Sequence, residues 1–245
     1  MPATLNHPSF KPPEHPLVKI WRYMDFTKYV HLLSSQSLYF SRSDRFDDPF
    51  EGSYSKHNVE IRPKIYEGKI PENRLLQMSK VYENMRIWTY INCWHINEYE
   101  SAAMWKLYAK SNEAIAIQSN YKRLCDLLPE YVFIGRVEYI DYENDWLPEG
   151  NTFYPFMHKR KSFEHEKELR AIIQDFPIVN DVVDPKAKNE ILGKMVNVPL
   201  DKLLDQVYVA PTADEWFFHV VKGVTEKYGC NIGVTKSKLD DKPVY

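Results

Sequence analysis

The chain has 245 residues, 44% of them hydrophobic, which is enough for one large domain or two small ones with a substantial core. With 32 lysines and arginines against 34 aspartates and glutamates, the net charge of -2 excludes an overall field that would hold the chain on nucleic acid or an anionic membrane. Three widely spaced cysteines, no signal-peptide pattern and no run of 18 apolar residues predict a cytoplasmic protein with no membrane partner.

The start of the chain is rich in proline. Residues 1–16 carry five prolines, which exclude a helix or a central strand. We therefore expect an extended N-terminal arm at 1–16, followed by a single α+β domain at 17–245. The alternation in residues 18–23 predicts the first strand, and Asp25 or Thr27 is placed to cap the helix that follows.

The next segments alternate between extended and helical patterns. Residues 38–41 predict a second strand, and the sequence FDDPFEG at 46–52 predicts a turn-rich loop, because the Asp-Pro step disfavours helix and Gly52 tolerates unusual backbone angles. Residues 63–86 are polar with a helical pattern. Residues 87–94 are aromatic and β-branched, which is typical of a buried strand.

The second half of the chain continues this irregular order. Helices are predicted at 100–110, 124–128 and 216–228, and strands at 114–118, 135–142, 169–173, 196–200, 207–209 and 232–234. The connections suit antiparallel neighbours. We therefore predict an α+β fold with a mixed, mostly antiparallel sheet and flanking helices.

Charged residues alternate at the start of one predicted strand. Glu166, Glu168 and Arg170 stand just before the apolar residues 171–173, so a strand near the middle of the sheet would project two carboxylates and a guanidinium from one face. Neighbouring carboxylates repel, which separates their pKa values unless a cation or a ligand offsets the repulsion. An edge strand that carries its charges outward explains the same pattern. The basic run at 158–161 fits a solvated face or a contact with polyphosphate or nucleic acid.

Two common kinds of site are missing from the sequence. It contains no Gly-x-Gly-x-x-Gly turn and no Walker loop, which argues against a Rossmann domain and a P-loop enzyme. Cys93 and His95 have no second pair at zinc-ligand spacing, so we expect no metal site. Any bound nucleotide must be held by another arrangement.

Several motifs together resemble a widespread bacterial family of unknown function, domain-of-unknown-function family 2971. They are WRY at 21–23, LYFS at 38–41, FDDPFEG at 46–52, MWKLYA at 104–109, Glu-x-Glu-x-Arg at 166–170 and SKL at 237–239. Their order and spacing match from about Val18 to Leu239, and Asp47 stands where the family more often has asparagine. The family carries no established reaction, so the resemblance implies kinship rather than function.

A second resemblance is to the ADP-ribosyltransferases, which bind NAD without a glycine-rich turn. It rests on a strand with Arg22, a strand ending at Ser41 and a late Glu-x-Glu strand, in that order. It implies that Glu168 stabilises the oxocarbenium-like centre left by nicotinamide, as a glycosidase carboxylate does, and that Glu166 handles the acceptor. NAD is then a substrate, and Arg22 binds its ribose or phosphate oxygens.

The same resemblance implies an aromatic and hydroxyl lining for the pocket. Tyr39 and Ser41 line the ribose site, and Trp105 or Tyr108 stacks on nicotinamide or adenine. The same residues also fit purely structural roles. Ser41 can cap a turn, and Trp105 and Tyr108, which lie on the predicted helix, can belong to the core.

Two further charged residues are expected behind the pocket. Arg170 should approach Glu168 or Asp48, and Arg170 and Asp48 should support the residues that line the pocket.

The sequence thus predicts an NAD-consuming ADP-ribosyltransferase or NAD glycohydrolase, whose partners are a small-molecule nucleotide and a protein or nucleic-acid acceptor. Two alternatives stay open: a non-catalytic nucleotide-sensing or protein-interaction module, and a metal-dependent nuclease using Asp47, Asp48 and Glu51 with the glutamates.

Overall fold

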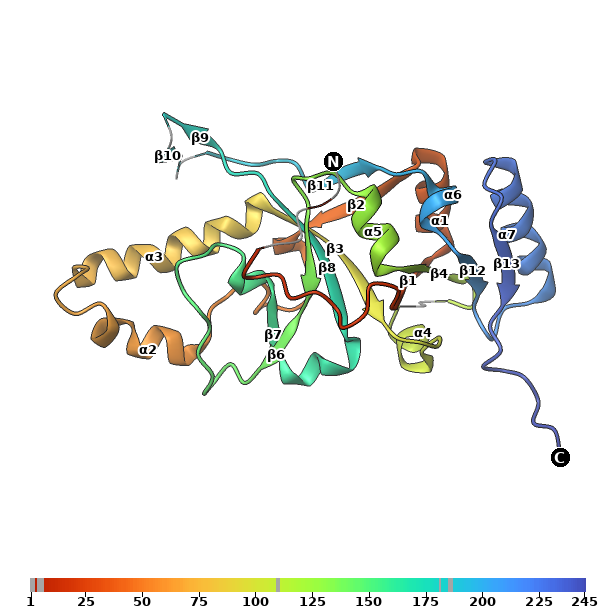
Figure 1. Ribbon diagram of the computed structural model, residues 1–245, viewed down its shortest axis with the longest axis horizontal. Helices are drawn as coiled ribbons and strands as arrows, with labels where there is room; N and C mark the ends of the chain where they lie inside the picture. Colours follow the sequence, from red (N-terminus) through yellow and green to blue (C-terminus); the bar gives the residue numbers. More distant parts are fainter. Residues whose placement is uncertain (1–2, 4–6, 109–110, 181, 185–186) are drawn as a thin grey trace.

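The computed structural model describes residue 3 and residues 7–108, 111–180, 182–184 and 187–245. The α+β prediction is confirmed: the described chain forms a nine-stranded sheet, antiparallel at every pairing except that of β12 with β13, with helices packed against it (Figure 1). Its strands are β1 (Lys19–Asp25), β2 (Ser37–Arg42), β3 (Thr89–Ile96), β4 (Ala114–Asn120), β5 (Phe133–Arg136), β8 (Glu168–Gln174), β11 (Gly193–Asn197), β12 (Gln206–Val209) and β13 (Gly233–Lys236).

The helices and smaller elements fill the connections between these strands. The α-helices are α1 (Phe26–Ser35), α2 (Lys56–Ile65), α3 (Glu72–Met85), α4 (Ala102–Tyr108), α5 (Tyr121–Leu127), α6 (Leu200–Leu203) and α7 (Glu215–Lys227). The 3-10 helices are η1 (Ser43–Arg45), η2 (Arg86–Trp88), η3 (Tyr154–Phe156) and η4 (Lys161–Glu166). Two ribbons pair β6 (Glu138–Ile140) with β7 (His158–Arg160), and β9 (Ile178–Val179) with β10 (Val182–Val183).

Strand β3 is the hub of the sheet, and the sheet splits beside it. One edge of β3 pairs with β8 along its length, from Thr89 to His95. The other edge pairs with β2 at its start, where Ile91 faces Ser41, and with β1 at its end, where His95 faces Trp21. Since β1 and β2 meet opposite ends of the same edge, they diverge from each other and leave an opening between them.

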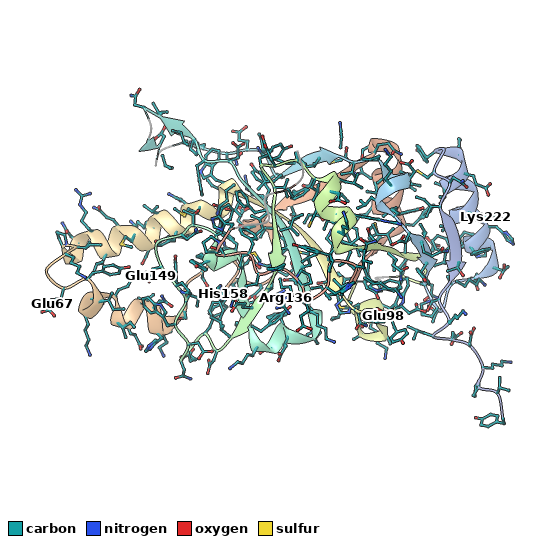
Figure 2. The ribbon with its side chains drawn as sticks, viewed as in Figure 1. Glu67, Glu98, Arg136, Glu149, His158 and Lys222 are labelled. Atoms are coloured by element: carbon teal, nitrogen blue, oxygen red, sulfur yellow. The ribbon has the colours of Figure 1, made fainter. Side chains whose placement is uncertain are left out.

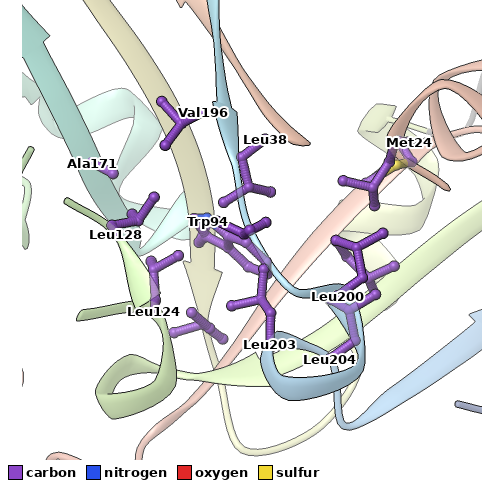
Figure 3. Packing of buried hydrophobic residues seen from close by; sticks show 14 of the residues in the cluster. Met24, Leu38, Trp94, Leu124, Leu128, Ala171, Val196, Leu200, Leu203 and Leu204 are labelled. Atoms are coloured by element: carbon purple, nitrogen blue, oxygen red, sulfur yellow. The ribbon is translucent and has the colours of Figure 1, made fainter. Parts of the chain in front are cut away.

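The main core lies between one face of the sheet and the helices α1, α5, α6 and α7. Leu38 of β2, Trp94 of β3 and Ala171 of β8 pack there against leucines of α5 and α6 (Figure 3). Each buried leucine stabilises this layer by roughly 1.5–3 kcal/mol. Because side chains alternate along a strand, burial of Leu169 and Ala171 in this core directs Glu168 and Arg170 to the opposite face.

The described part of the N-terminal arm lies against the sheet. Phe10 is buried, and the next residue, Lys11, forms a backbone bridge to Arg136 at the end of β5. Gly135 permits this approach, because a Cβ at that position would lie 2.7 Å from the Phe10 Cα. The described residues of the proline-rich segment contain turns and no helix, and they pack against β5.

Several predicted boundaries differ from the structure. The helical region predicted at 63–86 is two helices, α2 and α3, which project together from one end of the sheet (Figure 1). A buried ion pair ties this projection to the loop between β6 and η3, since Arg62 Nε lies 2.7 Å from Oε1 of Glu149, the residue labelled in Figure 2. No helix of the described chain is both long enough and apolar enough to span a membrane.

Candidate functional site

A cleft of about 790 Å³ opens where β1 and β2 diverge. Its walls include residues from both faces of the sheet, so it passes through the split beside β3. Most of the residues predicted for the site line it: Arg22, Tyr39, Ser41, Asp48, Tyr108, Glu166 and Glu168. Two predicted residues do not line it, Trp105 and Arg170, and both are buried beside or beneath it.

Glu168 is the first residue of β8, and Arg170 holds its carboxylate from below. Arg170 Nε lies 3.0 Å and Nη2 2.8 Å from the same oxygen, Glu168 Oε2. Burial alone would raise the pKa of Glu168, but the Arg170 guanidinium and the Lys159 ammonium outweigh it and hold the pKa below its ordinary value. Glu168 therefore presents an ionised carboxylate to the cleft at neutral pH.

The prediction that Glu166 and Glu168 share one strand is wrong. Glu166 ends η4, and Lys167 adopts a left-handed conformation with φ of 41°, so the strand begins only at Glu168. The two carboxylates nevertheless meet at one cation. Lys159 Nζ lies 2.6 Å from Oε2 of Glu166 and 3.7 Å from Oε2 of Glu168.

The basic run at 158–161 is not a solvated patch at its centre. His158 and Lys159 are buried, and Arg160 Nη2 lies 2.8 Å from Oδ1 of Asp48. Burial lowers the pKa of Lys159, but the carboxylates of Glu168 and Glu166 overcome this and raise it. The sequence does not assign Lys159 to the site. Its role depends on contacts with Glu166 and Glu168, and a basic run in the sequence does not show which carboxylates lie near it.

The FDDPFEG loop is fastened beneath the cleft. Glu51 is buried and accepts two hydrogen bonds from Arg170, at 2.7 and 2.8 Å. Burial raises the pKa of Glu51 more than the Arg170 guanidinium lowers it. Burial would lower the pKa of Arg170, but the Glu168 and Glu51 carboxylates raise it well above its usual range. Gly52, with φ of +72°, packs against Phe156. Arg170 thus lies beneath the cleft, whereas Asp48, which was predicted to lie behind it, lines its wall.

The ion pairs of Asp48 and Glu51 weaken the alternative that these residues bind a metal in a nuclease. Asp48 is paired with Arg160 and Glu51 with Arg170, so neither carboxylate is free to ligate an ion. Within the described residues, no cluster of three or more His, Cys, Asp or Glu side chains could hold a metal. Asp48 and Glu51 therefore fasten the loop to β7 and β8.

Arg22 is a cation of the cleft wall that has no ion pair with the described residues. Trp21 and Tyr23 pack with the α4 side chains on one face, so the alternation along β1 turns Arg22 toward the opening between β1 and β2. Its Nη2 lies 3.4 Å from the backbone oxygen of Tyr39, and no carboxylate of the described chain lies within ion-pair distance. Burial without a counter-ion lowers the pKa of Arg22 because it disfavours the charged guanidinium. An anionic ligand beside Arg22 would stabilise that charge.

The aromatic residues predicted for the site divide between wall and core. Tyr108 is 40% exposed and lines the cleft, where burial and the nearby Glu166 and Glu168 carboxylates raise its pKa. Trp105 is 4% exposed; its Nε1 donates to Glu100 Oε2 at 3.0 Å, and its ring meets that of Tyr23 edge-on. The structure therefore places Trp105 in the core next to the cleft, not at a stacking position.

Tyr39 and Ser41 lie on the β2 wall of the cleft. Tyr39 is 39% exposed and donates from its hydroxyl to the Leu192 backbone oxygen at 3.3 Å. Its ring lies over Gly193, where a Cβ would meet it at 2.2 Å. Ser41 is half-buried, faces Ile91 across the β2–β3 ladder and lines the wall of the cleft.

His95 is a further cleft residue that sequence reasoning did not assign to the site. It lies near the end of β3 opposite Glu168, and its Nδ1 lies 2.6 Å from the Glu166 backbone oxygen. Its position one strand away from the glutamates depends on the β3–β8 register, which the sequence does not reveal.

Comparison with known proteins adds no assignment. No protein-family profile matches the chain, and no curated protein matches it. The resemblance to the bacterial family and that to ADP-ribosyltransferases remain predictions, so the cleft must be interpreted from its own chemistry.

Proposed function

We propose that the protein cleaves the bond between nicotinamide and ribose in NAD, as an NAD glycohydrolase or an ADP-ribosyltransferase. The observation that carries the proposal is the Glu168 carboxylate, which lines the cleft in its ionised form and is fixed by Arg170. Departure of nicotinamide leaves a cationic ribose carbon, and a fixed negative charge stabilises that carbon as the charge develops.

The position of the cations around Glu168 fits this task. The contacts of Arg170 and Lys159 with the carboxylate all converge on Oε2. Oε1 has no cationic partner in the described chain, and the Cys93 thiol is a further hydrogen-bond partner of the carboxylate. A carboxylate held in this way needs no reorganisation when the transition state forms.

The charges along the cleft also match a dinucleotide with one cationic end. Arg22 and the α1 residues Lys28 and His31 line the cleft on the side of the main core. Glu166 and Glu168 line it on the other side. NAD carries an anionic diphosphate and a cationic pyridinium ring, so its two ends suit the two sides of the cleft.

Aromatic side chains flank the acidic side. Tyr108 and Phe163 line the cleft, and Phe163 lies under the Lys159 ammonium, 4.5 Å from ring centroid to Nζ. A flat heteroaromatic ring such as nicotinamide packs well against such walls. Arg22, as a planar fork with several donors, suits a phosphate group.

The test is release of free nicotinamide from NAD by the purified protein, with calorimetric binding of NAD measured in parallel. NADH is the matched control ligand, because it has the same diphosphate but no pyridinium charge and is not expected to release its ring. We expect NAD to bind and to be cleaved. Binding without cleavage would support the nucleotide-sensing alternative, and absence of binding at millimolar NAD, with or without cell extract, would contradict the proposal.

A further inference from the structure

His95 is held across from Glu168 in a fixed orientation. The β3–β8 register pairs these two residues directly, so both side chains leave the same face of the sheet. His95 is 4% exposed and lines the cleft. Its Nδ1 lies 2.6 Å from the Glu166 backbone oxygen, and since a carbonyl oxygen only accepts, Nδ1 carries the ring proton.

The other ring nitrogen has no partner. With the proton on Nδ1, Nε2 is a lone-pair acceptor, and it is buried without a hydrogen bond to any described residue. Buried polar atoms in proteins are nearly always paired, so an orphan acceptor on the wall of a cleft points to a ligand that donates to it. Burial lowers the pKa of His95 despite the bond to the Glu166 carbonyl, which keeps the ring neutral at pH 7 and able to take up a proton.

We infer that Nε2 of His95 is the general base that takes the proton from the attacking O–H group, water in the simplest case. The inference rests on the proposed function. As the bond between C1′ of the ribose and the nicotinamide nitrogen breaks, its electron pair leaves with nicotinamide. The water oxygen forms the new bond to C1′, its proton passes to Nε2, and the imidazolium later releases that proton to solvent.

The charges around the ring are consistent with a neutral base. Tyr23 of β1 lies edge-on to it, at 6.3 Å between ring centroids. Lys167 and His165 oppose a positive charge on His95. The titratable groups that the structure places against His95 are Tyr23, His165, Glu166, Lys167 and its register partner Glu168. Lys159 pairs with Glu166, and Arg170 pairs with both Glu168 and Glu51, so each of these carboxylates has a cationic partner.

The chain supplies a matched control histidine. His158 is also buried and also bonds through Nδ1 to a backbone oxygen, that of Tyr154 at 2.7 Å, but it does not line the cleft (Figure 2). Asparagine keeps an amide N–H near Nδ1 and removes Nε2. Comparing His95→Asn with His158→Asn therefore separates loss of the base from loss of a buried imidazole.

The experiment measures nicotinamide release by wild type, His95→Asn and His158→Asn, with NAD binding by calorimetry. We expect His95→Asn to lose roughly 100-fold or more in turnover with little change in NAD affinity, and His158→Asn to stay within about threefold of wild type. The wild-type rate should fall with decreasing pH below 6.5, as Nε2 is protonated, and His95→Asn should lack this acid limb. Free imidazole should restore turnover to His95→Gly.

The outcomes separate this inference from the proposed function. No cleavage of NAD by wild type would overturn both. An active wild type beside an equally active His95→Asn would overturn the inference alone. If His95→Asn does not fold, nitrogen NMR shifts of the wild-type ring decide: a proton on Nε2 contradicts the inference, and a proton on Nδ1 with Nε2 responding to bound ADP-ribose supports it.

Discussion

The Arg170 guanidinium and the Glu51 carboxylate are joined by two parallel hydrogen bonds, of 2.7 and 2.8 Å, between side chains that are no more than 1% exposed. The two residues are 119 positions apart in the chain. Their pairing fastens the loop after β2 to the strand that carries Glu168. The rigidity of the candidate site therefore depends on a buried pair in which Glu51 lines the cleft and Arg170 lies beneath it.

Removing one partner of this pair should destabilise the fold. Arg170→Ala would leave the carboxylates of Glu51 and Glu168 buried without their main cation, which costs about 3–5 kcal/mol. Urea denaturation followed by circular dichroism measures the change. Arg136→Ala, an exposed position on the adjacent β5 (Figure 2), should change the free energy of unfolding by under about 0.5 kcal/mol. Equal midpoints for both variants would show that Arg170 is not a structural anchor.

Gly52 should be intolerant of a side chain for two reasons that can be separated. Its φ of +72° disfavours any L-residue, and a Cβ there would lie 2.3 Å from the Phe156 ring. Gly68 has φ of +70° with nothing within 4 Å. Gly68→Ala should therefore cost about 1–2 kcal/mol from the backbone alone, and Gly52→Ala a further 1–3 kcal/mol or so from overpacking. Similar melting temperatures for the two variants would argue against tight packing of the loop on Phe156.

Arg22 should contribute to ligand binding and not to stability. Arg22→Met keeps the aliphatic stem but removes a cation with no carboxylate partner in the described chain. A hydrogen bond to a charged group contributes about 1.5–3 kcal/mol, so NAD affinity should fall roughly 10- to 150-fold in calorimetry. The urea midpoint should hold or rise, because the substitution removes a partly buried charge that has no carboxylate partner in the described chain. Arg74→Met on the projecting α3 serves as the control, and unchanged NAD affinity in Arg22→Met would remove Arg22 from the binding site.

The stabilising role of ionised Glu168 should depend on pH. Its pKa in the folded protein lies below the ordinary value of 4.5, so the stability it contributes is present above pH 4.5 and is lost as the pH falls through the folded value. The difference in urea midpoint between wild type and Glu168→Gln should thus be largest near neutral pH and narrow below pH 4.5. Glu67→Gln, an exposed position beyond α2, controls for the loss of one carboxylate. A difference that widens on acidification would contradict the assigned direction.

Local patterns were sufficient for the fold class and for several wall residues. The α+β prediction is confirmed, and Arg22, Ser41 and Glu168, predicted from their order along the chain, line one cleft. Strand alternation also predicted the shared face of Glu168 and Arg170, because both lie inside the regular strand β8.

Other features depended on contacts that no local pattern contains. The alternation of charged residues predicted that Glu166 lies in the strand. The left-handed conformation of Lys167 interrupts the extended chain, so Glu166 lies in η4 instead. Lys159 is buried because distant carboxylates surround it, whereas an isolated basic run is typical of solvent-exposed surface. Trp105 and Tyr108 share one short helix, yet only tertiary packing decides that Tyr108 lines the cleft and Trp105 enters the core.

The most direct test of the account compares nicotinamide release from NAD by wild type and Glu168→Gln. Glutamine keeps the shape of the side chain but removes the charge that stabilises the cationic ribose, and a loss of about 2.7–4 kcal/mol would slow turnover roughly 100- to 1000-fold. NAD binding should change much less, because the interaction strengthens as charge develops. Glu164→Gln, an exposed position on the neighbouring η4, should turn over NAD like wild type. Equal rates for wild type and Glu168→Gln would contradict the account.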